Sequence, residues 1–335
     1  MFLEQTTPSP AHLTPTDVVA IGEVLWDVIG AEKHLGGAPF NFAVHCRHLG
    51  ARSAIISRVG RDELGDEILA QARDLGVDTS LIQRDCEHPT GQVRVTLDAH
   101  GQPEFDICTG AAYDYLAAES AAIKRVRAAD VVCFGTLAQR HPVALQSIAT
   151  LLEAASRALL VCDLNLRPPH YSAEVVRDSL ARCHLLKLNG DELHVVQGML
   201  GRDGRSAERG STERSAERSR RSLAEVSRRS LDEDNFLLHL LEAYEIELVC
   251  VTLGARGCIL RTFEERVAAP GYPCRVVDTV GSGDAFTAAL VIKYLAGWPL
   301  AEVADFANLV GAYVATQHGA TPPITPDALE GFANK

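Results

Sequence analysis

The chain of 335 residues predicts an α/β fold with a mostly parallel central sheet. Two observations support this prediction. Short runs of apolar residues alternate with helical patterns, and each run is followed by a glycine or a polar residue. Strands that are apolar at every position are buried on both faces, so parallel strands with helices around them are expected. The runs are 18–21, 54–56, 131–134, 159–162, 185–188 and 248–251.

A helix follows the second run. Leu64, Ile68, Ala72 and Leu75 recur at helical spacing, and Gly76 is placed to end the helix.

Residues 92–107 break the pattern, because apolar and polar residues alternate there around a turn at 98–101. Alternation predicts a half-exposed hairpin. One interpretation is a small β-flap over a binding cleft, and the other is an edge hairpin without a role.

Composition narrows the class of protein. The net charge of -12 argues against nucleic acid or an anionic membrane as partner, and no apolar run is long enough to cross a membrane. The charge does not exclude ATP, because phosphate sites are built locally from backbone amides. The nine cysteines form no C-x-x-C pair and several lie in apolar runs, which indicates reduced, buried thiols. We therefore expect a cytoplasmic protein.

Two segments are expected to lie outside the packed core. Residues 1–16 are rich in Pro and Thr and lack the features of a signal peptide, so they predict a disordered tail. Residues 201–231 are rich in Arg, Ser and Glu, with the near repeats 205–209 and 214–218. So few apolar residues cannot form a core, which predicts a charged low-complexity insertion, either disordered or helical. A docking role for it has no support in the sequence.

Several polar side chains follow the predicted strands. In parallel sheets, ligands bind outside the carboxyl ends of the strands. Asp163, Asn165, Asn189 and Thr252 are therefore expected to face one cleft.

The stretch 278–286 carries the strongest chemical signal. Gly281, Ser282 and Gly283 let the backbone approach a ligand, and the helix that follows directs its positive N-terminal end to the same place. Asp284 is placed beside this anion hole to take a proton from an attacking hydroxyl. A phosphate cradle with a carboxylate base predicts a phosphoryl transferase. An ordinary glycine turn before a core helix is the alternative.

The helix after this turn is supported by its own pattern. Ala285, Ala288, Ala289 and Ile292 form one apolar stripe, and Gly297 is placed to end the helix.

The chain resembles the PfkB-type (ribokinase-like) sugar kinases. Residues 22–27 and 36–43 are similar to the N-terminal signature of that family, and 278–286 to its C-terminal signature. Further matches are 163–168, 189–192 and 251–257. The resemblance spans about 17–332 apart from the insertion, and within the family the fructokinases are most similar. It implies a three-layer α/β/α kinase domain over 17–335 with a small β-sheet lid drawn from about 24–40 and 90–110.

The resemblance assigns a sugar site. Asp27 and Asn41 offer a carboxylate and an amide for sugar hydroxyls, and Gly36 and Gly37 let the backbone approach the ring. Arg167 is expected to contact the sugar or the transferred phosphoryl group. The alternatives are a strand-end cap for Asp27 and a surface ion pair for Arg167.

The resemblance also assigns an ATP site to Asn189, Thr252, Gly254 and Asn308. Glu192 is expected to hold Mg²⁺ through water, because Mg²⁺ keeps several waters and takes few carboxylates. A helix-surface amide remains the alternative for Asn308.

Three more positions are expected to lie near the nucleotide. Gly319, Val310 and Val314 are expected to line its pocket. In relatives the glycine-rich loop binds a monovalent cation, often K⁺, and the resemblance extends this role to Asp278 and Val280.

Two histidines have a spacing that could suggest a metal site. His45 and His48 lie three residues apart on a predicted helix, without further metal ligands, and are expected to be helix-surface residues.

These expectations combine into an ATP-dependent sugar kinase that phosphorylates the 6-hydroxyl of D-fructose, with Asp284 as base. A kinase of 2-keto-3-deoxygluconate or another sugar is the first alternative, because Arg167 could bind a carboxylate. A catalytically silent relative that binds sugar or a partner protein in a regulatory role is the second. A second copy of the chain, joined through the lid, is a further partner to consider, because exposed sheets often pair.

Overall fold

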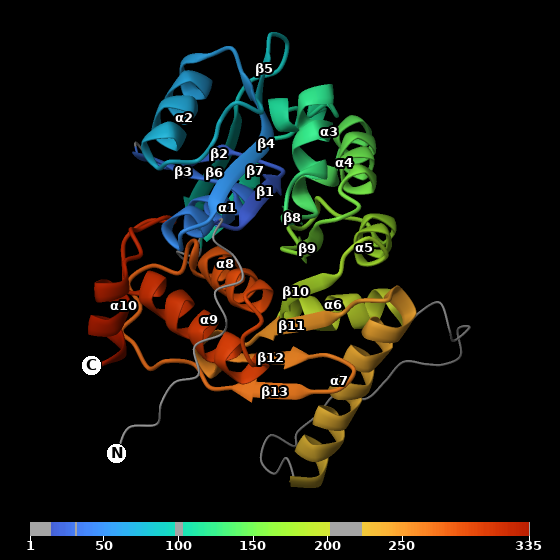
Figure 1. The fold of residues 1–335 in the computed structure, drawn as a ribbon. Helices are drawn as coiled ribbons and strands as arrows, with labels where there is room; N and C mark the ends of the chain where they lie inside the picture. Colours follow the sequence, from blue (N-terminus) through green and yellow to red (C-terminus); the bar gives the residue numbers. More distant parts are fainter. Residues whose placement is uncertain (1–14, 31, 98–102, 202–222, 335) are drawn as a thin grey trace.

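The computed structural model describes residues 15–30, 32–97, 103–201 and 223–334. Its centre is a nine-stranded sheet in the order β13-β12-β11-β10-β9-β8-β1-β4-β5 (Figure 1). All neighbours from β11 to β5 are parallel, and β12 and β13 are antiparallel. The strands are β1 (Asp17–Ile21), β4 (Arg52–Gly60), β5 (Ile82–Asp85), β8 (Val131–Phe134), β9 (Leu159–Asp163), β10 (Leu185–Asn189), β11 (Leu248–Thr252), β12 (Cys258–Arg261) and β13 (Arg266–Ala269).

Helices cover both faces of this sheet, which gives three layers. One face packs against α1 (Ala38–His48), α2 (Glu63–Asp74), α8 (Ser282–Leu295), α9 (Leu300–Ala315) and α10 (Pro326–Ala333). The other face packs against α3 (Ser120–Arg127), α4 (Pro142–Ala154), α5 (Ala173–Leu180), α6 (Gly190–Leu200) and α7 (Leu223–Tyr244).

Successive residues of each strand enter opposite cores. Val18 and Ala20 lie in the core beneath α1 and α8, whereas Val19 and Ile21 lie in the core beneath α3 and α4. Side chains alternate between the two faces of a strand, so a strand buried on both faces is apolar throughout. This explains why the continuous apolar runs predicted the central strands.

A second sheet of four strands has the order β3-β2-β6-β7. It contains β2 (Leu25–Ile29), β3 (Glu32–Gly36), β6 (Gly91–Leu97) and β7 (Pro103–Ile107). The central pair β2-β6 is parallel and the two outer pairs are antiparallel. The predicted hairpin is the β6-β7 pair, and its turn lies outside the described residues.

The predicted fold class is confirmed, with its mostly parallel sheet and small second sheet. The two helices predicted from their apolar spacing are α2 and α8. Gly76 follows α2 with φ of 76°, and Gly297 follows α8 with φ of 71°. Of the predicted insertion, 202–222 lies outside the described residues, and 223–231 forms the start of α7. The predicted tail is outside them up to residue 14. No helix in the described ranges is long and apolar enough to cross a membrane.

Candidate active site

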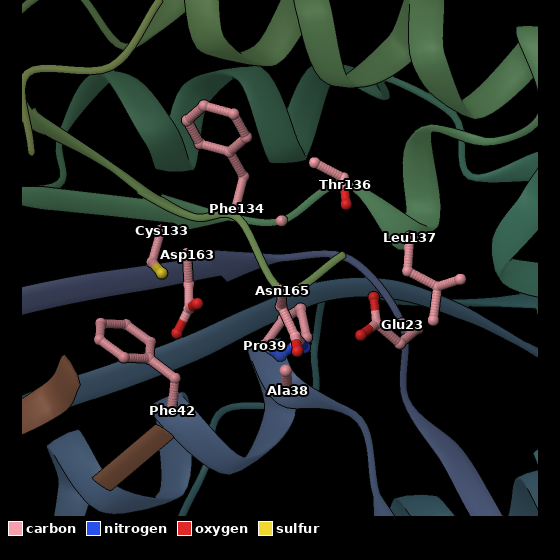
Figure 2. A pocket seen from close by; sticks show the side chains of 11 residues that line it. Glu23, Ala38, Pro39, Phe42, Cys133, Phe134, Thr136, Leu137, Asp163 and Asn165 are labelled. Carbon is pink, nitrogen blue, oxygen red and sulfur yellow. The ribbon is translucent and has the colours of Figure 1, made fainter. Parts of the chain in front are cut away.

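A cavity lies where β1, β8 and β9 end and α1 begins (Figure 2). The parallel strands bring these ends to one edge of the sheet, and α1 closes the space from the other side. Glu23 and Asn165 contribute polar side chains to the cavity (Figure 2). The remaining lining residues are Ala38, Pro39, Phe42, Cys133, Phe134, Gly135, Thr136, Leu137 and Asp163. Of the four residues expected to face one cleft, Asp163 and Asn165 line this cavity.

Asp284 in α8 lies next to α1. The Nδ2 amide of Asn41 in α1 donates a hydrogen bond of 2.8 Å to Oδ2 of Asp284 in α8. The two residues are 243 positions apart in the chain, and the packing of α1 on α8 brings them together. This contact joins segment 36–43 to segment 278–286.

The surroundings of Asp284 change its proton affinity. Burial, reinforced by the negative charge of Asp163, raises the pKa of Asp284 to about 7. The Asn41 amide, Lys187 and Arg167 oppose this change. A carboxyl group with a pKa near neutral is suited to accept a proton in one step and release it afterwards.

The glycine turn before α8 has the geometry of an anion cradle. Gly281 caps the helix with φ of 77°, and a Cβ there would collide with the Ala320 carbonyl oxygen. Only glycine satisfies both conditions without strain. The Ser282 hydroxyl donates to the Thr279 carbonyl over 2.8 Å and holds the turn closed. The N–H of Ser282 also donates to the Thr279 carbonyl, at 3.3 Å. The N-terminal end of α8 still offers a favourable position for an anion, because the helix dipole is positive there.

The predicted sugar residues lie around the second sheet. Asp27 is half-buried in β2, and its carboxylate lies directly against Gly36 in β3. Burial raises the pKa of Asp27, and the positive charges of Arg167 and His34 oppose the change. Gly37 caps α1 with φ of 108°, and a Cβ there would collide with the Glu23 carbonyl.

Arg167 is solvent-exposed in the loop after β9. Its charge acts on Asp27, Glu23 and Asp284, which places the guanidinium within electrostatic reach of all three carboxyl groups.

Two of the predicted nucleotide residues, Asn189 and Thr252, are the last residues of β10 and β11 and are paired in register. Asn189 caps α6: its Oδ1 accepts the N–H groups of Asp191 and Glu192, each at 2.9 Å. Gly254 follows with φ of 59° in an exposed turn. Asn189 and Thr252 therefore lie side by side at the carboxyl ends of their strands, but they do not line the cavity of Figure 2.

Asn308 is buried in α9. Its Nδ2 donates to the Pro270 carbonyl at 3.1 Å and so fastens α9 to the segment after β13. The helix-surface alternative for Asn308 is therefore wrong.

The residues around Asn308 pack as core. Val310 and Val314 are fully buried among apolar neighbours. Their expected place beside the nucleotide stays a prediction.

Asp278 links two loops. Its Oδ1 accepts the N–H of Val280 at 3.0 Å, and its Oδ2 accepts the N–H of Gly319 at 3.2 Å. The glycine-rich loop is thus tied to the loop after α9. The monovalent-cation role of Asp278 and Val280 stays a prediction.

Comparison with known proteins decides the family. Residues 15–328 match the pfkB family of carbohydrate kinases. The chain belongs to this family. A sugar kinase of Pyrococcus horikoshii is 30% identical over 327 residues, which cover 93% of this chain and 94% of that protein. Fructokinase-1 of Oryza sativa subsp. japonica is 28% identical over 334 residues, covering 92% and 94%. A structure of the Pyrococcus horikoshii kinase in complex with ATP has a TM-score of 0.72 at 26% identity, covering 91% and 95%.

The donor set for a metal in this pfkB kinase is sparse. The described residues contain no group of three or more His, Cys, Asp or Glu side chains placed to hold an ion. Glu192 accepts the N–H of Leu166 at 2.8 Å and the N–H of Asn189 at 2.7 Å, one on each carboxylate oxygen. Each oxygen keeps a further lone pair for a water. These residues fit a Mg²⁺ held mainly by phosphates and water, with Glu192 in its outer sphere.

Sequence reasoning missed Glu23, which lies inside the first family signature. It is 3% exposed, and burial raises its pKa to about 7, against the hydrogen bonds from its own N–H and that of Ala38. A glutamate two residues after a buried strand was the available signal.

Sequence reasoning also missed Lys187, which interrupts the apolar run of β10. Its Nζ lies 2.9 Å and 3.1 Å from the two carboxylate oxygens of Asp163 in β9. The Thr287 hydroxyl of α8 lies 3.0 Å from Oδ2 of the same carboxylate. A lysine within an otherwise apolar strand was the signal that could have revealed this cluster.

The expectation of surface histidines on α1 is wrong for His45. This side chain is fully buried, and its Nε2 donates to the Ala320 carbonyl over 2.9 Å. Burial lowers its pKa to about 4, so the ring is neutral near pH 7. Because α1 lies between the sheet and α8, it is buried on two sides, and His45 packs against the loop that supports Gly281.

Proposed function

We propose that this pfkB-family carbohydrate kinase transfers the γ-phosphoryl group of ATP to the 6-hydroxyl of D-fructose. The observation that carries the proposal is the contact between Asn41 and Asp284. In this contact, a carboxyl group of near-neutral pKa lies between α1 and the glycine turn that begins α8. Similarity to the rice fructokinase and to an ATP-bound sugar kinase supports the choice of the two substrates.

In this mechanism Asp284 accepts the proton of the sugar hydroxyl. The hydroxyl oxygen forms a bond to the γ-phosphorus while the bond from that phosphorus to the β-γ bridging oxygen breaks, and ADP leaves with the electron pair. The amides of Gly281 to Gly283 and the N-terminus of α8 stabilise the negative charge on the transferred group. Mg²⁺, when bound, neutralises phosphate charge, and Glu192 would hold its water shell.

The sugar would lie between the second sheet and the central cavity. Asp27 would accept a hydrogen bond from one sugar hydroxyl, and the amide of Asn41 would donate one to another. A site built to make such bonds rejects sugars that lack the matching hydroxyls. The second sheet would act as a lid that excludes water, which would otherwise consume ATP.

One observation favours a second candidate. The exposed guanidinium of Arg167 acts on Asp27 from the loop after β9, where it could pair with the carboxylate of an acid sugar such as 2-keto-3-deoxygluconate.

A coupled assay of ADP release tests the proposal, with ATP and Mg²⁺ across fructose, ribose, 2-keto-3-deoxygluconate and adenosine. We expect the highest kcat/KM with fructose. Preference for 2-keto-3-deoxygluconate would replace the substrate and keep the mechanism, and Arg167→Ala would then raise KM for that acid selectively. The absence of turnover with every sugar in a wider panel would contradict the kinase proposal and favour a silent binding protein.

A further inference from the structure

A buried cation lies beneath the glycine turn. Lys187 is 7% exposed, and a Cβ placed on Gly283 would lie 3.4 Å from its Nζ. The ammonium group is therefore packed against the backbone that forms the proposed anion hole.

The neighbours of Lys187 keep it charged. Burial alone would lower the pKa of the ammonium, but the negative charges of Asp163, Glu192 and Asp284 raise it above its ordinary value. Asp163 takes both of the hydrogen bonds that Lys187 makes in the described part of the chain. An ammonium has three N–H donors, so one of them is not used by Asp163.

The same cluster holds the start of α8. The Thr287 hydroxyl lies 3.0 Å from Asp163 and 2.9 Å from the Gly283 carbonyl, and its single proton serves either acceptor. Asp163, Lys187 and Thr287 thus connect β9 and β10 to the first turn of the helix that carries Asp284.

We propose that Lys187 is a charge-balancing positioning residue of the transfer site: its ammonium stabilises the anion held in the glycine turn and keeps Asp284 ionised. Asp163 opposes it, because its negative charge favours the protonated form of Asp284. This inference rests on the proposed role of Asp284 as the base.

Other groups among the described residues also act on Asp284, and none of these is a second buried ammonium. Arg167 acts from an exposed loop, Glu23 is an acid, and Cys133 is a thiol whose pKa burial raises. Asn41 is uncharged. Lys187 is the buried cation that can offset Asp163, so the two residues should shift the proton affinity of Asp284 in opposite directions.

The test compares Lys187→Met, Asp163→Asn and the double variant, using the sugar that gives the highest turnover. The pH profile of kcat/KM is measured from about pH 5 to 9, where the acid limb reports the base of the free enzyme. Lys187→Met should move the acid limb to higher pH and lower kcat by about 10²-fold with little change in KM. Asp163→Asn should move it to lower pH, and the double variant should lie between the two.

Lys124→Met, on an exposed position of α3, is the matched control and should keep the wild-type profile. If Lys187→Met alone fails to fold, Asp163→Asn and the double variant, which removes both charges, decide the question. A shift in the same direction for both single variants, or no shift in either, would overturn the inference. Wild-type turnover in Asp284→Asn would instead show that the base assignment itself is wrong.

Discussion

At the scale of single residues, the proposed site depends on Asp284, whose neighbours shift the pKa of its carboxyl group in opposite directions. Burial and Asp163 favour the protonated form of Asp284, whereas Asn41 and Lys187 favour the ionised form. A pKa of about 7 results from this opposition, so small changes in the neighbours should move it across neutral pH.

Asn41→Ala tests this balance. The substitution removes the hydrogen bond to Asp284, and because that bond lowers the pKa, the pKa of Asp284 should rise. More of the base would then be protonated at pH 7, so kcat/KM should fall there and recover as the pH increases. Arg47→Ala, on an exposed position of the same helix, should keep the wild-type profile. An acid limb that stays in place or moves to lower pH would contradict this explanation.

At the scale of elements, we expect the start of α8 to determine where the transferred phosphoryl group binds. Gly281 combines a left-handed backbone with close contact to the Ala320 carbonyl, and His45 holds that carbonyl from α1. The turn is thus supported from two elements that are distant in sequence.

Gly281→Ala should displace the turn, because the new Cβ cannot fit against Ala320. We expect kcat to fall by about 10²-fold, the typical effect of losing a preorganised donor. Gly297→Ala is a matched control: its φ of 71° is also left-handed, but a Cβ there meets nothing within 4 Å. The control should lower the melting temperature slightly and leave kcat intact, so equal kcat values for both variants would contradict the assigned role of Gly281.

At the scale of the whole molecule, burial decides how much the sequence could predict. The central strands were predictable because both of their faces are buried, which leaves an unbroken apolar signal. The edge strand β13 is half-exposed and alternates, and it gave no such signal. The glycine turn with Asp284 was predictable because its chemistry is local.

The partners of Asp284 were harder to predict, because they depend on packing between distant segments. The sequence predicted a surface position for His45, but the packing of α8 on α1 buries it. Lys187 is tolerated in a buried strand because Asp163 on the neighbouring strand pairs with it. Sequence spacing carries no information about such contacts.

The most direct test of the central claim is to measure turnover and sugar binding together in Asp284→Asn. The substitution keeps the shape of the side chain and removes the base. We expect kcat to fall by about 10²- to 10⁴-fold, while calorimetry shows sugar affinity close to that of the wild type. Turnover equal to that of the wild type would contradict the assignment of Asp284 as the base.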